Sequence, residues 1–239
     1  MKDAALLARS LLFAVVFYLN TAVFLVLGSW LLAAPRRWAM AGLRLHGLAS
    51  LWWLKVICGT RVEVRGREKL PGGACLVASK HQSAWDTFAL IPVFRDPAMV
   101  MKAELGLIPL YGWFSHKFQH IFVRRDKGPS ALKAMIRDAR QRASQGREVV
   151  IFPEGTRTAP GAPADYKPGV AALYRDIDVP VHPVATNSGV HWPAHGFIRK
   201  PGTIVFEYLE PIPPGLKRAE FMRLLKERIE RASDRLRGE

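Results

Sequence analysis

The stretch Ala74-Cys75-Leu76-Val77-Ala78-Ser79-Lys80-His81-Gln82-Ser83-Ala84-Trp85-Asp86 carries most of the information about this chain. Its apolar first half predicts a buried strand, and its polar second half predicts a turn into a helix. A histidine at the end of a strand, with a carboxylate five residues later, is one way to build an oriented base. Such a pair also arises often by chance, so the rest of the chain has to show whether this pair is catalytic.

The flanking sequence predicts more strands and helices of the same kind. Arg61 to Arg65 alternates polar and apolar residues with a period of two, which is typical of a strand. Further strands are predicted at 98–101, 121–123, 149–152, 179–185 and 203–209. Helices are predicted from about Ser83 to Phe94, from Lys127 to near Gly146, and from about Arg218 to Arg237. Strands alternating with helices indicate an α/β fold, a mixed, mostly parallel sheet flanked by helices.

The N-terminal part of the chain has a different character. No charged residue occurs between Arg9 and Arg36, and this apolar run is long enough to cross a bilayer. Pro35 then breaks the helix, and a second, less apolar segment follows from Trp38 to Ile57. We therefore predict two membrane-anchoring helices in residues 1–58 and an α/β domain in residues 59–239. Basic residues flank both ends of the first segment, so two arrangements stay open: both helices dip into one leaflet, or the first one spans.

The composition narrows the class of partner. Lys and Arg total 35 against 20 acidic residues, a formal charge of +15, which indicates a nucleic acid, an anionic membrane or a phosphate-rich substrate. The apolar N-terminal segment argues against a nucleic acid. Only Cys58 and Cys75 are present, which predicts no disulfide framework and is typical of a reducing compartment. His191 and His195 have metal-ligand spacing, but Pro193 between them is incompatible with the helix such a pair needs, so no metal is predicted.

Three other predicted strands also end in residues that can bind a ligand. Phe152-Pro153-Glu154-Gly155-Thr156-Arg157 follows one strand, Arg124-Arg125 another, and Lys102 a third. Ligands of open α/β sheets bind at the carboxyl ends of the strands, so we expect these residues to meet His81 at one edge. Solvated basic pairs and an ordinary turn are the alternative interpretation of the same residues.

This ordered set of motifs resembles the glycerophospholipid acyltransferase family, the 1-acylglycerol-3-phosphate acyltransferases in particular. His81 to Asp86 is similar to that family's His-x4-Asp motif, and Phe122 to Arg125 to its second motif. Phe152 to Arg157 matches its third motif, and Val179 to Ala185 its apolar fourth. The chain departs from the family pattern at Gln119, Arg124 and Thr158, which leaves the exact acceptor open.

The resemblance implies a function and a role for each motif. His81 would be the base, oriented by Asp86, while Ser83 is more simply a helix cap than a nucleophile. The expected reaction, a step of phospholipid biosynthesis, moves an acyl group from acyl-CoA or acyl carrier protein to the sn-2 hydroxyl of lysophosphatidic acid, giving phosphatidic acid. The residues expected to bind substrate are Lys102, Arg125, Glu154, Gly155, Thr156 and Arg157.

The resemblance also implies which cofactors and partners the protein has and where in the cell it acts. It implies no cofactor, no metal and no nucleic-acid partner, and a bacterial inner-membrane enzyme with its active site at the cytoplasmic face. Two alternatives stay open. One is acylation of another lysolipid, such as a lyso-ornithine lipid or a lysophospholipid, and the other is non-catalytic binding of anionic lipid.

Overall fold

The computed structural model describes residues 2–70 and 72–239, and its centre is a mixed sheet. Within the described residues the sheet has seven strands in the order β1-β7-β6-β2-β5-β3-β4. Every neighbouring pair is parallel except β6 with β7. The predicted mixed, mostly parallel α/β sheet is therefore confirmed. The strands are β1 (Thr60–Arg65), β2 (Cys75–Ser79), β3 (Ala98–Lys102), β4 (Ile121–Val123), β5 (Glu148–Ile151), β6 (Val181–Thr186) and β7 (Gly202–Tyr208).

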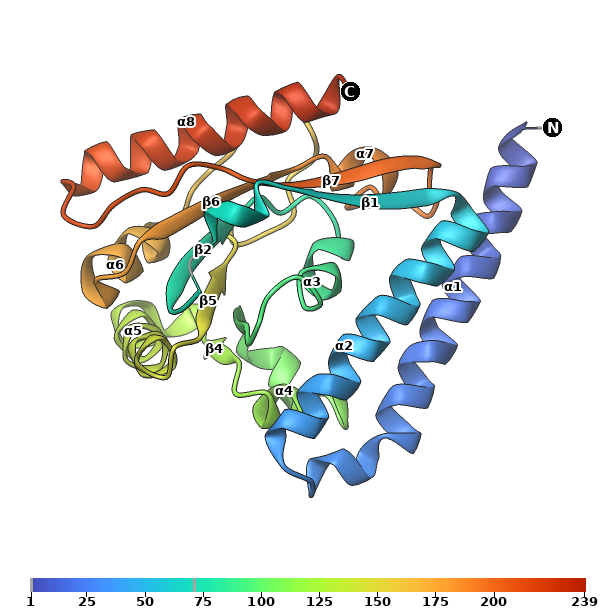
Figure 1. Cartoon of the computed structure of the whole chain (residues 1–239), viewed down its shortest axis with the longest axis horizontal. Helices are drawn as coiled ribbons and strands as arrows, with labels where there is room; N and C mark the ends of the chain where they lie inside the picture. Colours follow the sequence, from blue (N-terminus) through green and yellow to red (C-terminus); the bar gives the residue numbers. More distant parts are fainter. Residues whose placement is uncertain (1, 71) are drawn as a thin grey trace.

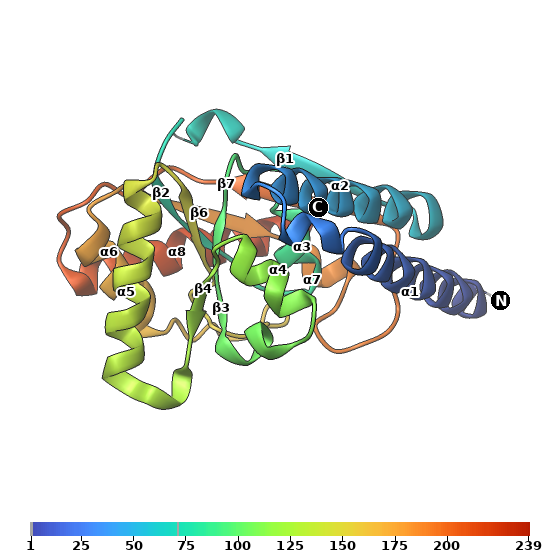
Figure 2. The same ribbon diagram turned by 90° about the horizontal axis from the view of Figure 1, so that it is seen from below.

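Helices cover both faces of this sheet (Figures 1 and 2). Side chains alternate along β2, so Leu76 and Ala78 pack in one core with α5, α6 and α8. Cys75 and Val77 point the other way, into a second core that includes α3 and residues of the N-terminal helices. The helices are α1 (Lys2–Leu27), α2 (Arg36–Trp53), α3 (Trp85–Ala89), α4 (Tyr111–Lys117), α5 (Gly128–Ser144), α6 (Pro168–Ile177), α7 (Ser188–His191) and α8 (Arg218–Arg237).

The helix predicted from about Ser83 to Phe94 is wrong in its length. Helix α3 ends at Ala89, and the chain continues through turns before β3. Pro92 explains the early end, because proline lacks the amide a helix needs and disfavours a helical backbone at the residue before it. Leu90 and Phe94 are still buried, so their apolar pattern reflects packing in a turn.

Helices α1 and α2 form an antiparallel hairpin that lies along the α/β region (Figure 1). Helix α1 is long and apolar enough to cross a membrane. Near its start, Ser10 Oγ accepts from the Arg199 amide (2.8 Å), and the Phe13 ring packs edge-on against Trp192 (5.4 Å between centroids). Near the turn between the two helices, Arg36 forms an ion pair with Asp96. The hairpin is thus attached to the α/β region near both of its ends. The predicted boundary between residues 58 and 59 stays a prediction.

Candidate active site

His81 and Asp86 form the oriented pair that the sequence predicted. His81 follows the end of β2, Asp86 lies in the first turn of α3, and His81 Nδ1 is 3.0 Å from Asp86 Oδ2. The same carboxylate oxygen accepts from the backbone amides of Gln82 (2.7 Å) and Ser83 (2.8 Å). With Asp86 as the acceptor, Nδ1 carries the proton and Nε2 is left as the basic atom.

Ser83 takes a structural place in this loop. Its Oγ accepts a hydrogen bond from the amide of Trp85 at the start of α3 (3.1 Å), and its own amide is bound by Asp86. The expected helix cap is wrong in its position, because Ala84 is the N-cap of α3 and the Ser83 oxygen binds the amide two residues on, in a local turn.

Two further contacts hold the His81 ring and its backbone. The ring stacks on Phe152, with 4.1 Å between centroids and an interplanar angle of 20°. The His81 amide donates to Glu154 Oε2 (2.9 Å), and its carbonyl accepts from the Thr158 amide (2.8 Å). The loop after β5 therefore holds the loop after β2 in place, and the His81 imidazole has little freedom to reorient.

A cavity of about 780 Å³ opens beside His81, at the carboxyl ends of four strands. In the sheet, β2, β5, β3 and β4 are consecutive parallel neighbours, so their ends share one edge. Five of the six residues expected to bind substrate line this cavity together with His81: Lys102, Arg125, Gly155, Thr156 and Arg157. Apolar side chains complete the lining, among them Val100, Val123, Leu132, Met135 and Ile151.

The cationic side of the cavity is built on a tight turn after β5. The Gly155 amide donates to the carbonyl of Phe152 (2.9 Å), and Gly155 has a φ of +67°, in the left-handed region that favours glycine. Arg125 NH2 donates to the carbonyl of Gly155 (2.6 Å), which joins the loops after β4 and β5. Lys102 and Arg157 are exposed in the same lining. Lys167, just before α6, also lines the cavity, so four cationic side chains border a space that His81 also borders.

Glu154, the sixth predicted binding residue, lies elsewhere. Its side chain is 1% exposed and does not line the cavity. Its Oε1 accepts from Lys80 Nζ (2.7 Å), while its Oε2 holds the His81 amide. Burial raises the pKa of this carboxyl, and the adjacent Lys80 ammonium opposes that effect. In this structure, Glu154 contacts the backbone of His81 directly.

Lys80 extends this network to the C-terminal helix. Its ammonium also donates to both carboxylate oxygens of Glu230 on α8 (2.9 and 2.8 Å), and Glu230 in turn accepts from the Tyr166 hydroxyl (2.8 Å). Sequence reasoning missed Lys80, Glu230 and Tyr166. Lys80 lies next to His81, but its partners are 74 and 150 residues away, and no spacing rule connects them.

The two histidines with metal-ligand spacing are placed differently. His195 lines the cavity, whereas His191 Nδ1 is 3.1 Å from the carbonyl of Pro201. Across residues 2–70 and 72–239, no group of three His, Cys, Asp or Glu side chains is arranged to hold a metal ion.

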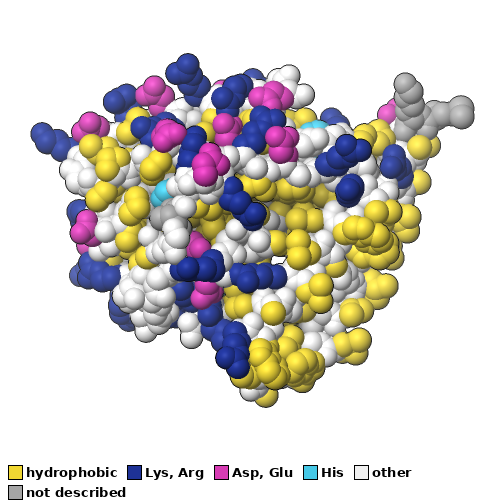
Figure 3. Space-filling model, in the orientation of Figure 1, with side chains coloured by type: hydrophobic (Ala, Val, Ile, Leu, Met, Phe, Trp, Pro, Cys, Tyr) yellow, Lys and Arg dark blue, Asp and Glu magenta, His cyan; other side chains and the backbone are white. Residues whose placement is uncertain are grey.

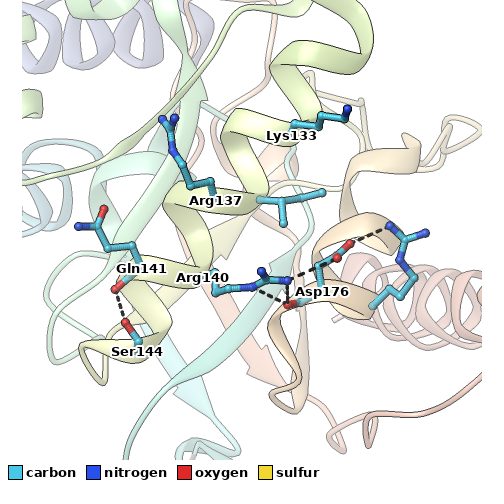
Figure 4. A pocket seen from close by; sticks show the side chains of 8 residues that line it. Lys133, Arg137, Arg140, Gln141, Ser144 and Asp176 are labelled. Carbon is cyan, nitrogen blue, oxygen red and sulfur yellow. Dashed lines mark hydrogen bonds and ion pairs between the residues drawn. The ribbon is translucent and has the colours of Figure 1, made fainter.

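A second hollow, of about 600 Å³, lies between α5 and α6 (Figure 4). Its cations are Lys133, Arg137, Arg140 and Arg175, and Arg140 donates to the carbonyl of Asp176 (2.9 Å). None of the predicted site residues lines it. The cavity beside His81 is therefore the candidate active site.

Comparison with known proteins agrees with this assignment. A family model described as "Acyltransferase" matches residues 61–187. The chain is 38% identical to a 1-acyl-sn-glycerol-3-phosphate acyltransferase of Pseudomonas aeruginosa, over 65% of this chain and 60% of that protein. It is 29% identical to a lyso-ornithine lipid O-acyltransferase of the same species, over 74% and 75% of the two chains. Thus the match to the first relative spans about 60% of that protein's length.

One solved structure has the same fold over almost the whole chain. It is the 1-acyl-sn-glycerophosphate acyltransferase PlsC from Thermotoga maritima, with a TM-score of 0.81 and 23% identity, covering 97% of this chain and 98% of that one. The family resemblance carried by the four motifs is confirmed, since the matching family model covers more than half of the sequence. The chain belongs to the acyltransferase family.

Proposed function

We propose that this protein transfers a fatty acyl group from an acyl thioester to the sn-2 hydroxyl of lysophosphatidic acid, giving phosphatidic acid. The observation that carries the proposal is the position of His81: a base oriented by Asp86 borders the same cavity as Lys102, Arg125 and Arg157. A base beside a cluster of cations suits an alcohol that also carries a phosphate.

In the proposed reaction, His81 Nε2 removes the proton from the acceptor hydroxyl as its oxygen attacks the thioester carbonyl. Asp86, at 3.0 Å from Nδ1, stabilises the imidazolium that forms. The tetrahedral intermediate then collapses, the carbon–sulfur bond breaks, and the leaving thiolate takes the proton from His81. The alcohol attacks directly, so no acyl-enzyme is needed, in keeping with the engaged Ser83 hydroxyl.

The phosphate of the acceptor is proposed to bind between Lys102, Arg125 and Arg157. Guanidinium groups bind phosphate oxygens in a bidentate geometry, and Lys102 adds a mobile point charge. Gly155 and Thr156 shape the turn that presents Arg157. The apolar lining around Leu132 and Met135 suits the acyl chain.

Glu154 is proposed to support the active site from outside the cavity. Both of its carboxylate oxygens are engaged, one by Lys80 and one by the His81 amide. Its part in substrate binding is therefore to hold the loop that presents Gly155 and Arg157 against the loop that presents His81.

We propose a bacterial inner-membrane location, with the cavity at the cytoplasmic face, and acyl-CoA or acyl carrier protein as the donor. The hairpin of α1 and α2 is attached to the α/β region near both ends, which favours embedding in one leaflet over crossing it. The charge of +15 suits an anionic surface, where each nearby Lys or Arg contributes about 1 kcal/mol.

A lyso-ornithine lipid is the second candidate acceptor. It is favoured by the relative of that name, which is matched over three quarters of its length. An acceptor without phosphate would leave the cations of the cavity without their proposed partner. Arg124, the unusual residue of the second motif, does not line the cavity.

The acceptor is tested by turnover of the purified protein. Lysophosphatidic acid, a phosphate-free monoacylglycerol and a lyso-ornithine lipid would each be offered with acyl-CoA and with acyl carrier protein. We expect transfer to lysophosphatidic acid alone, and Arg125→Gln should raise KM for it. Equal turnover on the phosphate-free acceptor would contradict the phosphate site, and no turnover on any acceptor would favour a non-catalytic lipid binder.

A further inference from the structure

A short segment of the α/β region exposes an unusual number of large apolar side chains. Among the described residues from 60 onward, five large hydrophobic side chains are exposed, and four of them lie between residues 107 and 113. These four are Leu107 (81% exposed), Ile108 (45%), Tyr111 (39%) and Trp113 (56%). Single exposed apolar residues are ordinary, but a concentrated patch marks an interaction surface. We call residues 107–113 the apolar segment.

The backbone of the apolar segment is held firmly, so the exposure is built into the fold. Gly112 packs so closely on Gly106 that a Cβ at Gly112 would be 2.1 Å from the Gly106 carbonyl oxygen. Leu110 has a φ of +59°, a region that non-glycine residues rarely occupy. Ser115 Oγ donates to the Tyr111 carbonyl (2.8 Å). The fold thus stabilises a tight turn whose large side chains point outward.

The apolar segment continues the apolar surface of the N-terminal hairpin. Helix α4 lies beside the turn between α1 and α2 (Figures 1 and 2), and the Phe114 ring packs on Phe24 with 5.0 Å between centroids. That turn exposes Trp30 and Trp38, which are 59% and 50% exposed. Figure 3 shows hydrophobic side chains spread over the hairpin side of the molecule, whereas charged side chains gather on the other side.

The apolar segment is also joined directly to the cavity. A short 3₁₀ helix, η4 (Ala103–Leu107), follows Lys102 at the end of β3. Lys102 and Leu105 line the cavity, while Leu107 at the far end of the same element is the most exposed of the large hydrophobic side chains. One rigid element therefore connects a cavity wall to the apolar surface.

We propose that the apolar segment inserts into the headgroup–acyl boundary of a lipid bilayer, as a second attachment point beside the hairpin. Tryptophan and tyrosine favour this boundary, and leucine and isoleucine favour the acyl region below it. With both attachments in place, the wall of the cavity formed by Lys102 and Leu105 lies at the lipid surface. A lysolipid can then enter from the leaflet while its polar part stays among the cations.

The insertion is tested by labelling the full-length protein at one introduced cysteine. Cys58 and Cys75 are buried, so an environment-sensitive fluorophore reacts selectively at Ile108→Cys or, as a control, at Arg231→Cys on the exposed side of α8. The protein is placed in vesicles of phosphatidylethanolamine and phosphatidylglycerol that contain a nitroxide-labelled lipid. We expect several-fold stronger quenching at 108 than at 231, and equal quenching at the two positions would overturn the proposal.

Iodide in the aqueous phase separates a lipid contact from a protein contact. In vesicles at a low protein-to-lipid ratio, we expect the label at 108 to be shielded from iodide and quenched by the nitroxide-labelled lipid. Shielding from iodide without quenching by that lipid would show that protein, such as a second copy of the chain, covers the segment, and this would also overturn the proposal.

A second experiment rests on the proposed acyl transfer. Leu107→Ser combined with Ile108→Ser is compared with Leu107→Met combined with Ile108→Val, which keeps the surface apolar. On a long-chain acceptor in vesicles, we expect the serine pair to lose roughly tenfold in kcat/KM and the apolar pair to lose little. On a short-chain, water-soluble acceptor both should match the parent protein. An equal loss on the two acceptors would contradict the insertion, whereas an inactive parent protein would bear on the proposed reaction and leave the labelling result intact.

Discussion

Lys80 and Glu154 form a buried ion pair directly beneath the proposed base. Their side chains are 2% and 1% exposed, and the distance from Nζ to Oε1 is 2.7 Å. Charges this deeply buried are tolerated only when each has a partner, because their lost hydration has to be offset. Glu230 is a second partner of Lys80, but the ammonium of Lys80 is the one cation within hydrogen-bond distance of Glu154 among the described residues.

Because Lys80 has two carboxylate partners and Glu154 has one cationic partner among the residues that the structure describes, substitutions of the two residues should lower the stability of the protein by different amounts. Lys80→Met should lower the free energy of unfolding by about 3–5 kcal/mol, because it leaves the Glu154 carboxylate buried without a cation. Glu154→Gln should cost less, since Lys80 keeps Glu230. The double variant should be more stable than Lys80→Met alone, and denaturant unfolding in detergent measures all three. If the two single effects simply add in the double variant, the pair is not coupled as described.

At the residue scale, the sequence predicted the pairing of His81 with Asp86 and the polar residues Lys102, Arg125, Thr156 and Arg157 that line the cavity with it. Those residues follow predicted strands. Because ligands of open α/β sheets bind at the carboxyl ends of the strands, the residues at those ends were expected to lie together. The same rule placed Glu154 in the cavity, but its carboxylate faces inward. A side chain's direction after a tight turn depends on the partner it meets, and Lys80 and Glu230 become its neighbours only through folding.

At the scale of elements, the turn between β3 and β4 determines how one wall of the cavity meets the apolar segment. A Cβ at Gly112 would be 2.1 Å from the Gly106 carbonyl oxygen, and a Cβ at Gly106 would be 2.9 Å from the Phe122 ring. Helix α4 and η4 are therefore packed as one unit, with Phe114 buried in the hairpin contact.

Gly112→Ala tests this packing. A Cβ at this position would be 2.1 Å from the Gly106 carbonyl oxygen, so the turn must shift, at a cost of about 1–3 kcal/mol of stability. Gly73→Ala is the matched control, because a Cβ there meets no heavy atom within 4 Å. Thermal unfolding in detergent should show a lower Tm for Gly112→Ala alone. Equal Tm values for both variants would mean that the turn is not tightly packed.

The sequence predicted the strands better than the short helices. Strands β2 and β6 are wholly buried and mostly apolar, which makes them recognisable in the sequence. Helices α4 and α7 have seven and four residues, too few for a helical period to be recognised. Helix α3 was overextended because buried apolar residues in a turn resemble one face of a helix.

On the scale of the whole molecule, a charged cluster joins the hairpin to the sheet. Arg36 at the start of α2 and Arg147 beside β5 both pair with Asp96. His120 lies next to this cluster and accepts from the Met99 amide through Nδ1 (3.2 Å). Burial, with Arg147 nearby, lowers the pKa of His120 from 6.5 to about 3.

This lowered pKa predicts a pH dependence of stability. Between about pH 6.5 and pH 3 the unfolded chain binds a proton at His120 that the folded chain does not bind. The folded state should therefore lose about 1.4 kcal/mol per pH unit from this residue as the pH falls through that window. In His120→Asn, whose side-chain oxygen can accept from the Met99 amide, that contribution is absent. Denaturant unfolding at several pH values measures the difference, and parallel profiles for the two proteins would contradict the assignment.

The arrangement of the whole molecule was only partly predictable. The apolar N-terminus and Pro35 predicted two helices, and the structure has them, but the first one ends earlier than predicted: α1 stops at Leu27, and Pro35 is the N-cap of α2. Their position along the α/β region depends on contacts such as Ser10 with Arg199 and Phe13 with Trp192. The apolar segment was not predicted either, because its side chains have the composition of a core and only the folded chain shows that they face outward.

The central claim is that His81 is the base for a lipid hydroxyl, and single-turnover acyl transfer to lysophosphatidic acid tests it most directly. The parent protein and His81→Ala would be compared in vesicles, with membrane association measured in parallel. We predict that His81→Ala loses about 10²–10⁴-fold in the rate of transfer while association persists. A rate within about tenfold of the parent protein would contradict the account, because general-base catalysis by His81 would then contribute less than a base of this kind supplies.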